Sequence, residues 1–324
     1  MSVDFLTDIE ARRLAEDFVA HEPPATPVQE IIDSGEIPRL KGYKIKPGKV
    51  SDSIFGGRFS HHDKEYENPS LYTKFGTSLR LMVRTQRIST HNKNRGEIPF
   101  KDQILAMNHH FMRRIVRAII GTSQYDVPEL EDSSVVVAAE NLSMVMFENV
   151  LRAYAAKSTT ATSLYQAHFV RNERWYASHL LPEGLIPNGP LPYVMDTPST
   201  KDEDDKTVDP GYLFAKGICT QQEYKAIINA SLVAFGAVSQ FLGQRNIILV
   251  DTKTEHGRTL DGKIVSMDEL YTLDSSRFWL KDDYQAQWGR LLRGEIKELN
   301  PTSYSKEFAR GFSEGDKGYA PEQS

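Results

Sequence analysis

The chain has little cysteine, no long apolar run and no large excess of charge of one sign. Its 324 residues include one cysteine, Cys219, which cannot form a disulfide within the chain and favours a reducing compartment. No run of about 18 apolar residues is present, so we expect no membrane partner. Acidic residues interrupt the apolar stretches near the start, which predicts no targeting segment and a cytoplasmic location. The net charge of −5 argues against a nucleic-acid partner.

The composition is that of an ordinary globular protein. The chain is 40% hydrophobic and 26% charged, which excludes a disordered or fibrous protein. A single core rarely grows beyond about 250–300 residues, so we expect two lobes with a cleft between them. The predicted division is a helical extension at 1–40, a sheet lobe at 41–145 and a larger α/β lobe at 146–324.

Local patterns predict elements of both kinds. Capping-box spacing and apolar periodicity predict a helix over 7–20. A second helix is predicted over 103–120 from the spacing of residues such as Ile104 and Phe111. Short β-type runs occur at 78–83 and 133–138. The many prolines of residues 181–211 predict an ordered loop or a mobile flap.

The clearest local structure follows residue 220. Thr220 and Glu223 form a capping box, and an apolar stripe then continues to Gly243, which ends the predicted helix. The next apolar run, 247–250, is too short for a helix and predicts a buried strand. The pair Asp261-Gly262 after this strand indicates a hairpin.

This hairpin predicts a pair of carboxylates. A two-residue turn at Asp261-Gly262 places Glu255 directly opposite Asp268, on the face that also carries Lys253. Opposed like charges destabilise a sheet unless a cation lies between them, and Mg²⁺ favours one or two carboxylates plus phosphate oxygens. The alternative is that Lys253 pairs with both acids on a solvated face, and a bulge would change the register.

Weaker signals also point toward phosphate. The lysines and glycines of residues 42–57, including Lys49, are typical of a turn whose amides embrace phosphate, or of an exposed basic hairpin. Ser276 beside Arg277 suits a phosphate monoester, although a surface turn is the commoner explanation. The histidine pairs at 61–62 and 109–110 lack a zinc spacing and are interpreted as surface or cap residues.

Several segments together resemble the SAICAR synthetase family of purine biosynthesis. They share their order along roughly 260 residues with that family, far more than a single short motif would. The segments are Gly48-Lys49-Val50 with Asp52, Arg87-Ile88-Ser89, Ile98-Pro99-Phe100-Lys101, Glu148 with Arg152 and Ser158, Leu181-Pro182-Glu183-Gly184, Thr197-Pro198-Ser199-Thr200-Lys201, Asp251-Thr252-Lys253-Thr254-Glu255-His256-Gly257, Asp268-Glu269, Asp274-Ser275-Ser276-Arg277-Phe278-Trp279, and Tyr304 with Lys306, Phe308 and Arg310.

The resemblance implies a two-lobed α+β fold around an ATP cleft and an ATP- and Mg²⁺-dependent ligase, as a monomer or homodimer. The implied reaction activates the carboxylate of carboxyaminoimidazole ribotide with ATP and joins L-aspartate to it, giving SAICAR, ADP and phosphate. The residues that it implies are Lys49, Glu148 and Lys201 for ATP, Glu255 and Asp268 for the metal, Lys253 and Lys201 for catalysis, and Arg87, Ser89, Asn92, Arg152, Ser158, Ser276, Arg277 and Arg310 for substrates.

Some positions depart from the family pattern. Asn92 stands where the family has a carboxylate, Lys157 replaces a glycine, and Asp204 replaces a histidine. His256 replaces an aromatic residue. These departures keep two alternatives open: a paralogous ligase or phosphotransferase that activates another carboxylate, and a nucleotide-binding protein without turnover.

Overall fold

The computed structural model describes residues 27–61, 64–73, 76–90, 93–125, 135–201 and 205–304. The helix expected over 7–20 lies outside these residues.

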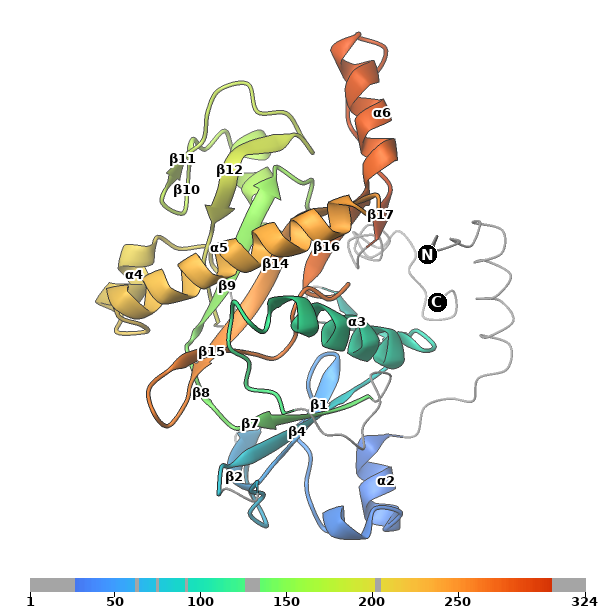
Figure 1. Cartoon of the computed structure of the whole chain (residues 1–324), viewed down its shortest axis with the longest axis vertical. Helices are drawn as coiled ribbons and strands as arrows, with labels where there is room; N and C mark the ends of the chain where they lie inside the picture. Colours follow the sequence, from blue (N-terminus) through green and yellow to red (C-terminus); the bar gives the residue numbers. More distant parts are fainter. Residues whose placement is uncertain are drawn as a thin grey trace.

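Two antiparallel sheets organise the described part of the chain, as Figure 1 shows. The smaller sheet has the order β1-β4-β7, and the main path of the larger sheet is β12-β9-β14-β16-β17. Strands β8, β13 and β15 extend the larger sheet, and β2-β3, β5-β6 and β10-β11 are two-stranded ribbons. The strands are β1 Ser51–Phe55, β2 Gly57–His61, β3 Lys64–Asn68, β4 Leu79–Arg84, β5 Arg87–Thr90, β6 Lys93–Glu97, β7 Val136–Glu140, β8 Ser143–Met144, β9 Phe147–Tyr154, β10 Trp175–Tyr176, β11 His179–Leu180, β12 Pro190–Asp196, β13 Ser199–Thr200, β14 Ile247–Arg258, β15 Ile264–Met267, β16 Ser276–Leu280 and β17 Ser303–Tyr304.

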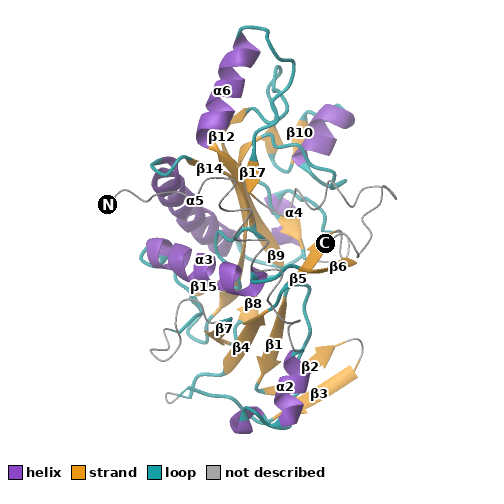
Figure 2. Cartoon of the chain, turned by 90° about the vertical axis from the view of Figure 1, so that its right-hand side faces the viewer, coloured by secondary structure: helices purple, strands orange, loops and turns teal. Residues whose placement is uncertain are grey.

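Helices pack beside these sheets, and Figure 2 shows α3 and α5 on the same side of the molecule. The helical segments are α2 Val28–Ser34, η1 Pro38–Leu40, α3 Lys101–Val116, η2 Gln166–Val170, α4 Pro210–Ala215, α5 Gln221–Gly243 and α6 Lys281–Leu292. The mixed composition and the antiparallel sheets confirm the predicted α+β class. The chain passes from the smaller sheet to the larger one between residues 140 and 143, and the predicted boundary near residue 145 stays a prediction.

Helix α5 confirms the predicted capping box and the predicted end at Gly243. The Thr220 hydroxyl accepts a hydrogen bond from the amide of Glu223, whose carboxylate accepts one from the amide of Thr220. Arg258 also donates to Glu223, and the pKa of this carboxyl falls to about 2, first because of that hydrogen bond. Among the described helices, α5 alone is long and apolar enough to span a membrane by length and composition. Its Phe235 and Val238 are buried in the main core, as expected for a core helix.

Helix α3 is present where the periodicity predicted a helix, but the apolar spacing marks the wrong face. Ile104 and Phe111 are 49% and 40% exposed, whereas His109 is fully buried. The prediction that His109 is a surface or cap residue is therefore wrong. A polar side chain can occupy a buried helix face when its hydrogen bonds are made there, and both ring nitrogens of His109 have partners.

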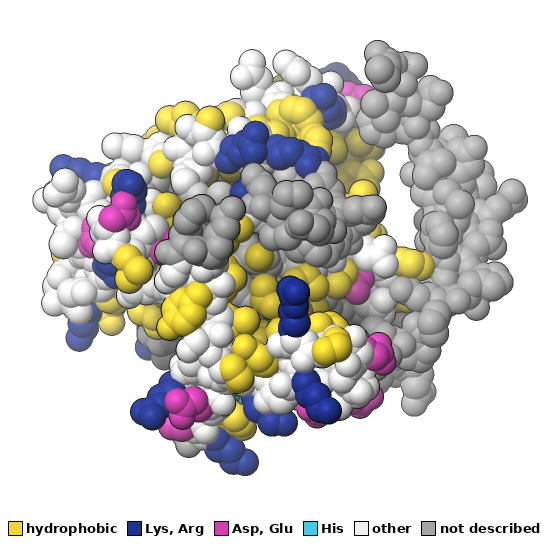
Figure 3. Space-filling model, turned by 60° about the horizontal axis from the view of Figure 1, so that its bottom comes forward, with side chains coloured by type: hydrophobic (Ala, Val, Ile, Leu, Met, Phe, Trp, Pro, Cys, Tyr) yellow, Lys and Arg dark blue, Asp and Glu magenta, His cyan; other side chains and the backbone are white. Residues whose placement is uncertain are grey.

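Apolar side chains also reach the surface elsewhere. On the face drawn in Figure 3, yellow apolar groups lie among dispersed dark-blue lysine and arginine side chains. Trp175 and Leu180, which pair in the β10-β11 ribbon, are 64% and 51% exposed.

The predicted hairpin forms, but its register differs from the prediction by one residue. Glu255 pairs with Met267 rather than with Asp268. The loop contains three residues instead of two: the amide of Thr259 bonds to the carbonyl of Lys263, and Gly262 has φ 79°. A three-residue loop with a left-handed residue at this position is a common hairpin connection, and its extra residue shifts every pair.

Asp268 still faces the same side as Glu255. It follows the last residue of β15 and has φ 63°, so strand alternation no longer fixes its direction. Both carboxylates line one cavity, which preserves the predicted juxtaposition by a different backbone route.

Candidate active site

A cavity of about 790 Å³ lies between the two sheets. Its walls come from β1 and β4 of the smaller sheet and from β9, β14 and β16 of the larger one. Most of the residues implied by the resemblance line it: Lys49, Ser89, Glu148, Arg152, Ser158, Lys201, Lys253, Glu255, Asp268, Ser276 and Arg277. Residues far apart in the sequence are thus brought to one place.

Among the described residues, one implied substrate residue, Arg87, does not line the cavity. Arg87 pairs with the buried carboxylate of Asp52 and donates to the carbonyl of Gly48 at 3.0 Å. Through these contacts Arg87 stabilises the glycine-containing turn at residues 46–50. Asn92 and Arg310 lie outside the described residues.

Strand β14 places Lys253 and Glu255 on the cavity floor. Glu255 pairs with Lys201 and lies 3.6 Å from Lys253 Nζ, while Lys253 also pairs with Glu148. Burial alone would raise the pKa of Glu148, but the charge of Lys253 and its hydrogen bond outweigh burial and lower it. The pKa of Lys253 is raised, because Glu148 and Glu255 outweigh its burial. Lys253 therefore stays protonated at neutral pH.

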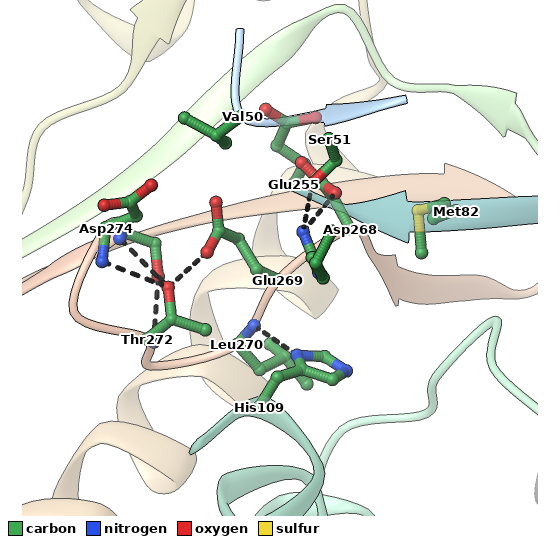
Figure 4. A network of polar contacts seen from close by, with 12 residues as sticks. Val50, Ser51, Met82, His109, Glu255, Asp268, Glu269, Leu270, Thr272 and Asp274 are labelled. Atoms are coloured by element: carbon green, nitrogen blue, oxygen red, sulfur yellow. Dashed lines mark hydrogen bonds and ion pairs between the residues drawn. The ribbon is translucent and has the colours of Figure 1, made fainter. Parts of the chain in front are cut away.

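The pKa values of Asp268 and Glu269 are shifted in opposite directions. Burial favours the neutral form of both, but the charges of Arg84 and Arg80 lower the pKa of Asp268. Arg84 Nη1 lies 3.7 Å from an Asp268 oxygen. The pKa of Glu269 is raised by burial, and its carboxylate accepts a hydrogen bond from Thr272 (Figure 4).

At the other end of the cavity, the carboxylate of Asp251 forms ion pairs with both Arg277 and Arg152. Arg277 donates through Nε and Nη2 to Asp251, and Arg152 Nη1 lies 3.3 Å from the same carboxylate. Arg152 Nε also donates to Thr197 at 3.0 Å. Because strand β14 pairs Asp251 with both arginines across the sheet, the cluster is fixed by register.

Hydroxyl groups and a buried ion pair complete this end. The hydroxyls of Ser276 and Thr252 are hydrogen-bonded at 2.8 Å and line the cavity. Lys101 forms a 2.9 Å ion pair with Asp274, and both side chains are less than a tenth exposed. This pair joins the start of α3 to the turn that leads into Ser276.

Sequence reasoning missed Arg80 and Glu269, which line the cavity, and Arg84, which lies behind it. The pKa of Arg80 is lowered by burial, although Asp268 and Glu255 act in the opposite direction. The signal was present, because charged residues at positions 80 and 84 share one face of a strand that is otherwise apolar.

The donor chemistry fits a metal that also binds a phosphate ligand. Glu255 and Asp268 supply carboxylate oxygens, which Mg²⁺ prefers. Within the described residues, no group of three or more histidine, cysteine or acidic side chains is placed to hold an ion by itself. A metal here would therefore take further oxygens from a bound ligand or from water.

A comparison with protein-family models identifies the family. The SAICAR synthetase family model matches residues 70–320. The chain belongs to the SAICAR synthetase family. The phosphoribosylaminoimidazole-succinocarboxamide synthase of Arabidopsis thaliana is 32% identical over 231 residues, which are 71% of this chain and 53% of that protein. The synthase of Legionella pneumophila strain Paris is 31% identical over 71% of this chain and 70% of its own.

Solved structures of SAICAR synthetases share this fold. The Saccharomyces cerevisiae SAICAR synthase complexed with SAICAR superposes with a TM-score of 0.60 at 18% identity, over 90% of this chain and 94% of that chain. A SAICAR synthetase in complex with ADP gives 0.58 at 20% identity, over 85% and 92%. The chain spans about half of the Arabidopsis relative, 53%, and 64% of the one from Vigna aconitifolia.

Proposed function

We propose that this SAICAR synthetase family member is an ATP-dependent ligase of purine biosynthesis. It joins L-aspartate to carboxyaminoimidazole ribotide and gives SAICAR, ADP and phosphate. The observation that carries the proposal is that most of the implied nucleotide, metal and substrate residues line one cavity of a chain that belongs to this family. Relatives named for this activity and a family structure with ADP support it.

The nucleotide end of the cavity is assigned to the residues near Glu255. Lys49 and Lys201 would contact phosphate oxygens, and Glu148 would border the nucleotide. Glu255 and Asp268 would hold Mg²⁺, which when bound neutralises charge on the β- and γ-phosphates. Lys253, held protonated between Glu148 and Glu255, would stabilise the charge that develops on the transferring phosphoryl group.

The substrate end is assigned to the cluster around Asp251. Arg277 and Ser276 would take the ribotide phosphate, because a guanidinium and a hydroxyl offer several donors to one phosphate. Arg152 and Ser158 would take the carboxylates of the amino acid. Asp251 orients both guanidinium groups before a substrate arrives.

The reaction then needs positioning more than covalent help from the protein. A carboxylate oxygen of the ribotide attacks the γ-phosphorus, the bond to the bridging oxygen breaks, and ADP leaves. The neutral amine of aspartate attacks the acyl carbon, the acyl C–O bond breaks, and phosphate departs with the electron pair. The amine proton passes to solvent or to the departing phosphate.

One departure that motivated the alternative acceptor is among the described residues. Lys157 pairs with Glu298 at 2.8 Å and is not among the residues that line the cavity. The other two departures that motivated it, at positions 92 and 204, lie outside the described residues. A cytoplasmic location and a monomeric or homodimeric state stay predictions.

An assay of ADP release tests the proposal. The purified protein, ATP and Mg²⁺ are incubated with carboxyaminoimidazole ribotide and a panel of amino acids, and the product is identified by mass spectrometry. We expect ADP release that requires both the ribotide and aspartate, with SAICAR as product. Release only with another carboxylate acceptor would establish the paralogous ligase, and nucleotide binding without release under any condition would establish the silent protein.

A further inference from the structure

His109 lies under the turn that carries Asp268, fully buried and outside the cavity wall. Its Nδ1 accepts a hydrogen bond from the backbone amide of Leu270 at 3.0 Å, as Figure 4 shows. Its Nε2 lies 2.6 Å from Oε1 of Gln124. The only backbone donor in this set is the Leu270 N–H, so Nδ1 must be the unprotonated nitrogen and Nε2 must carry the proton. The imidazole is therefore neutral and makes both of its bonds.

Gln124 continues this chain of contacts to Asp268 itself. Its side-chain Nε2 donates to the backbone carbonyl of Asp268 at 3.1 Å. The backbone carbonyl of Gln124 accepts a hydrogen bond from Arg113 at 3.0 Å. Gln124 is 6% exposed, so its amide has little access to water. The turn is thus held at both of its ends: at the Asp268 carbonyl by Gln124 and at the Leu270 amide by His109.

The turn needs such support because its backbone is strained. Asp268 and Tyr271 have φ values of 63° and 52°, a region that residues other than glycine seldom adopt. Such conformations persist only where the surroundings over-determine them. The same φ value aims the Asp268 carboxylate toward the cavity after the strand has ended, so relaxing the turn would turn this side chain away.

We propose that His109 and Gln124 are positioning residues, which hold the Asp268–Leu270 turn so that the Asp268 carboxylate is presented to a metal-nucleotide complex. This inference rests on the proposed role of Asp268 as a metal ligand. Neither residue lines the cavity, and each contacts the backbone of the turn. Partners that orient a metal ligand in this way commonly affect metal affinity by about 10-fold to 100-fold.

The test measures ligand binding by calorimetry, without turnover. The affinity for ADP is measured with Mg²⁺ and with EDTA for wild type, His109→Leu, His109→Asn and Gln124→Met. Leu105→Ala serves as control, because Leu105 is buried on the same helix but makes no hydrogen bond to the turn. Thermal unfolding of every variant shows that it is folded.

We expect His109→Leu and Gln124→Met to weaken Mg²⁺-dependent binding by about 10-fold and to leave binding in EDTA within about 2-fold. His109→Asn keeps an acceptor for the Leu270 amide and should recover part of the loss. Leu105→Ala should lower thermal stability without changing the effect of Mg²⁺. If the histidine and glutamine variants keep the full Mg²⁺ effect, or if Leu105→Ala loses as much, the inference is overturned.

Asp268→Asn separates this inference from the proposed function. If Asp268→Asn keeps the full Mg²⁺ effect, the metal role of Asp268 is wrong, and the inference fails with it. If Asp268→Asn loses the effect while His109→Leu and Gln124→Met retain it, the metal role stands and only the positioning role is wrong.

Discussion

Arg277 donates hydrogen bonds to the carboxylate of Asp251 through two guanidinium nitrogens. Arg277, which is implied to bind the ribotide phosphate, is therefore already paired with an acidic residue of its own sheet. The Arg277 side chain is only 13% exposed. A ligand phosphate would therefore meet a pre-oriented cation whose position is set before binding, which lowers the cost of ordering it.

Replacement of Arg277 by alanine should impair the phosphorylated substrate selectively. A hydrogen bond to a charged group contributes about 1.5–3 kcal/mol, so we expect KM for the ribotide to rise by about 10-fold to 100-fold. KM for ATP should change by less than about 2-fold, since Arg277 is assigned to the substrate end. Steady-state kinetics measures both values. Equal increases in the two KM values would remove the phosphate role, and Arg277→Lys should show a smaller defect of the same kind.

Loss of Asp251 should destabilise the fold. Arg152 and Arg277 are 14% and 13% exposed and would keep their charges without the shared carboxylate. Removing one partner of a buried ion pair costs about 3–5 kcal/mol, so Asp251→Ala should lower the free energy of urea unfolding by about that amount. Asp261→Ala, which breaks the exposed pair with Lys263, should change it little. A stable Asp251→Ala protein would show that the two arginines find another partner.

His256 should make the fold sensitive to mild acid. It is 2% exposed, neither ring nitrogen has a hydrogen-bond partner among the described residues, and burial lowers its pKa to about 4. The unfolded chain binds the proton more readily, so stability present above pH 6.5 is lost as the pH falls toward 4. Between pH 7 and pH 5 the loss from this group should be about 2 kcal/mol.

His256→Phe should reduce that loss and raise the thermal unfolding temperature at pH 5, because a buried unpaired polar ring is replaced by an apolar one. Unfolding curves at pH 7 and pH 5 measure the difference. An unchanged pH dependence in His256→Phe would assign the acid sensitivity to other groups.

A substitution in the capping box of α5 should lower the stability of the protein without affecting its activity. Thr220→Ala removes the side chain that accepts from the amide of Glu223, and loss of such a cap costs about 1 kcal/mol. Activity below the unfolding temperature should be unchanged, since neither residue lines the cavity. A loss of activity without a loss of stability would contradict this separation.

The sequence predicted local elements best where they are determined by near neighbours. The Thr220 cap, the end of α5 at Gly243 and strand β14, which is buried from Leu249, all depend on residues within one turn or one strand. The hairpin register was wrong because the number of loop residues cannot be read from the Asp-Gly pair alone. The direction of Asp268 depends on its positive φ, which no spacing rule reports.

The buried face of α3 shows the limit of periodicity. An apolar stripe normally marks the buried face, yet here Ile104 is exposed and His109 is buried. The buried position of His109 depends on partners at positions 124 and 270, far along the chain, and such long-range hydrogen bonds have no local signature. Most of the site residues that the resemblance implied line the cavity, and their roles stay predictions.

The account depends most on Glu255 and Asp268 acting together on a metal-bound nucleotide. The most direct measurement is the affinity for ADP with and without Mg²⁺, for wild type, Glu255→Gln and Asp268→Asn. Wild type should bind ADP at least about 10-fold more tightly with Mg²⁺, and either substitution should remove this difference while metal-free binding remains. If either variant keeps the full Mg²⁺ effect, the two acids do not form the metal site.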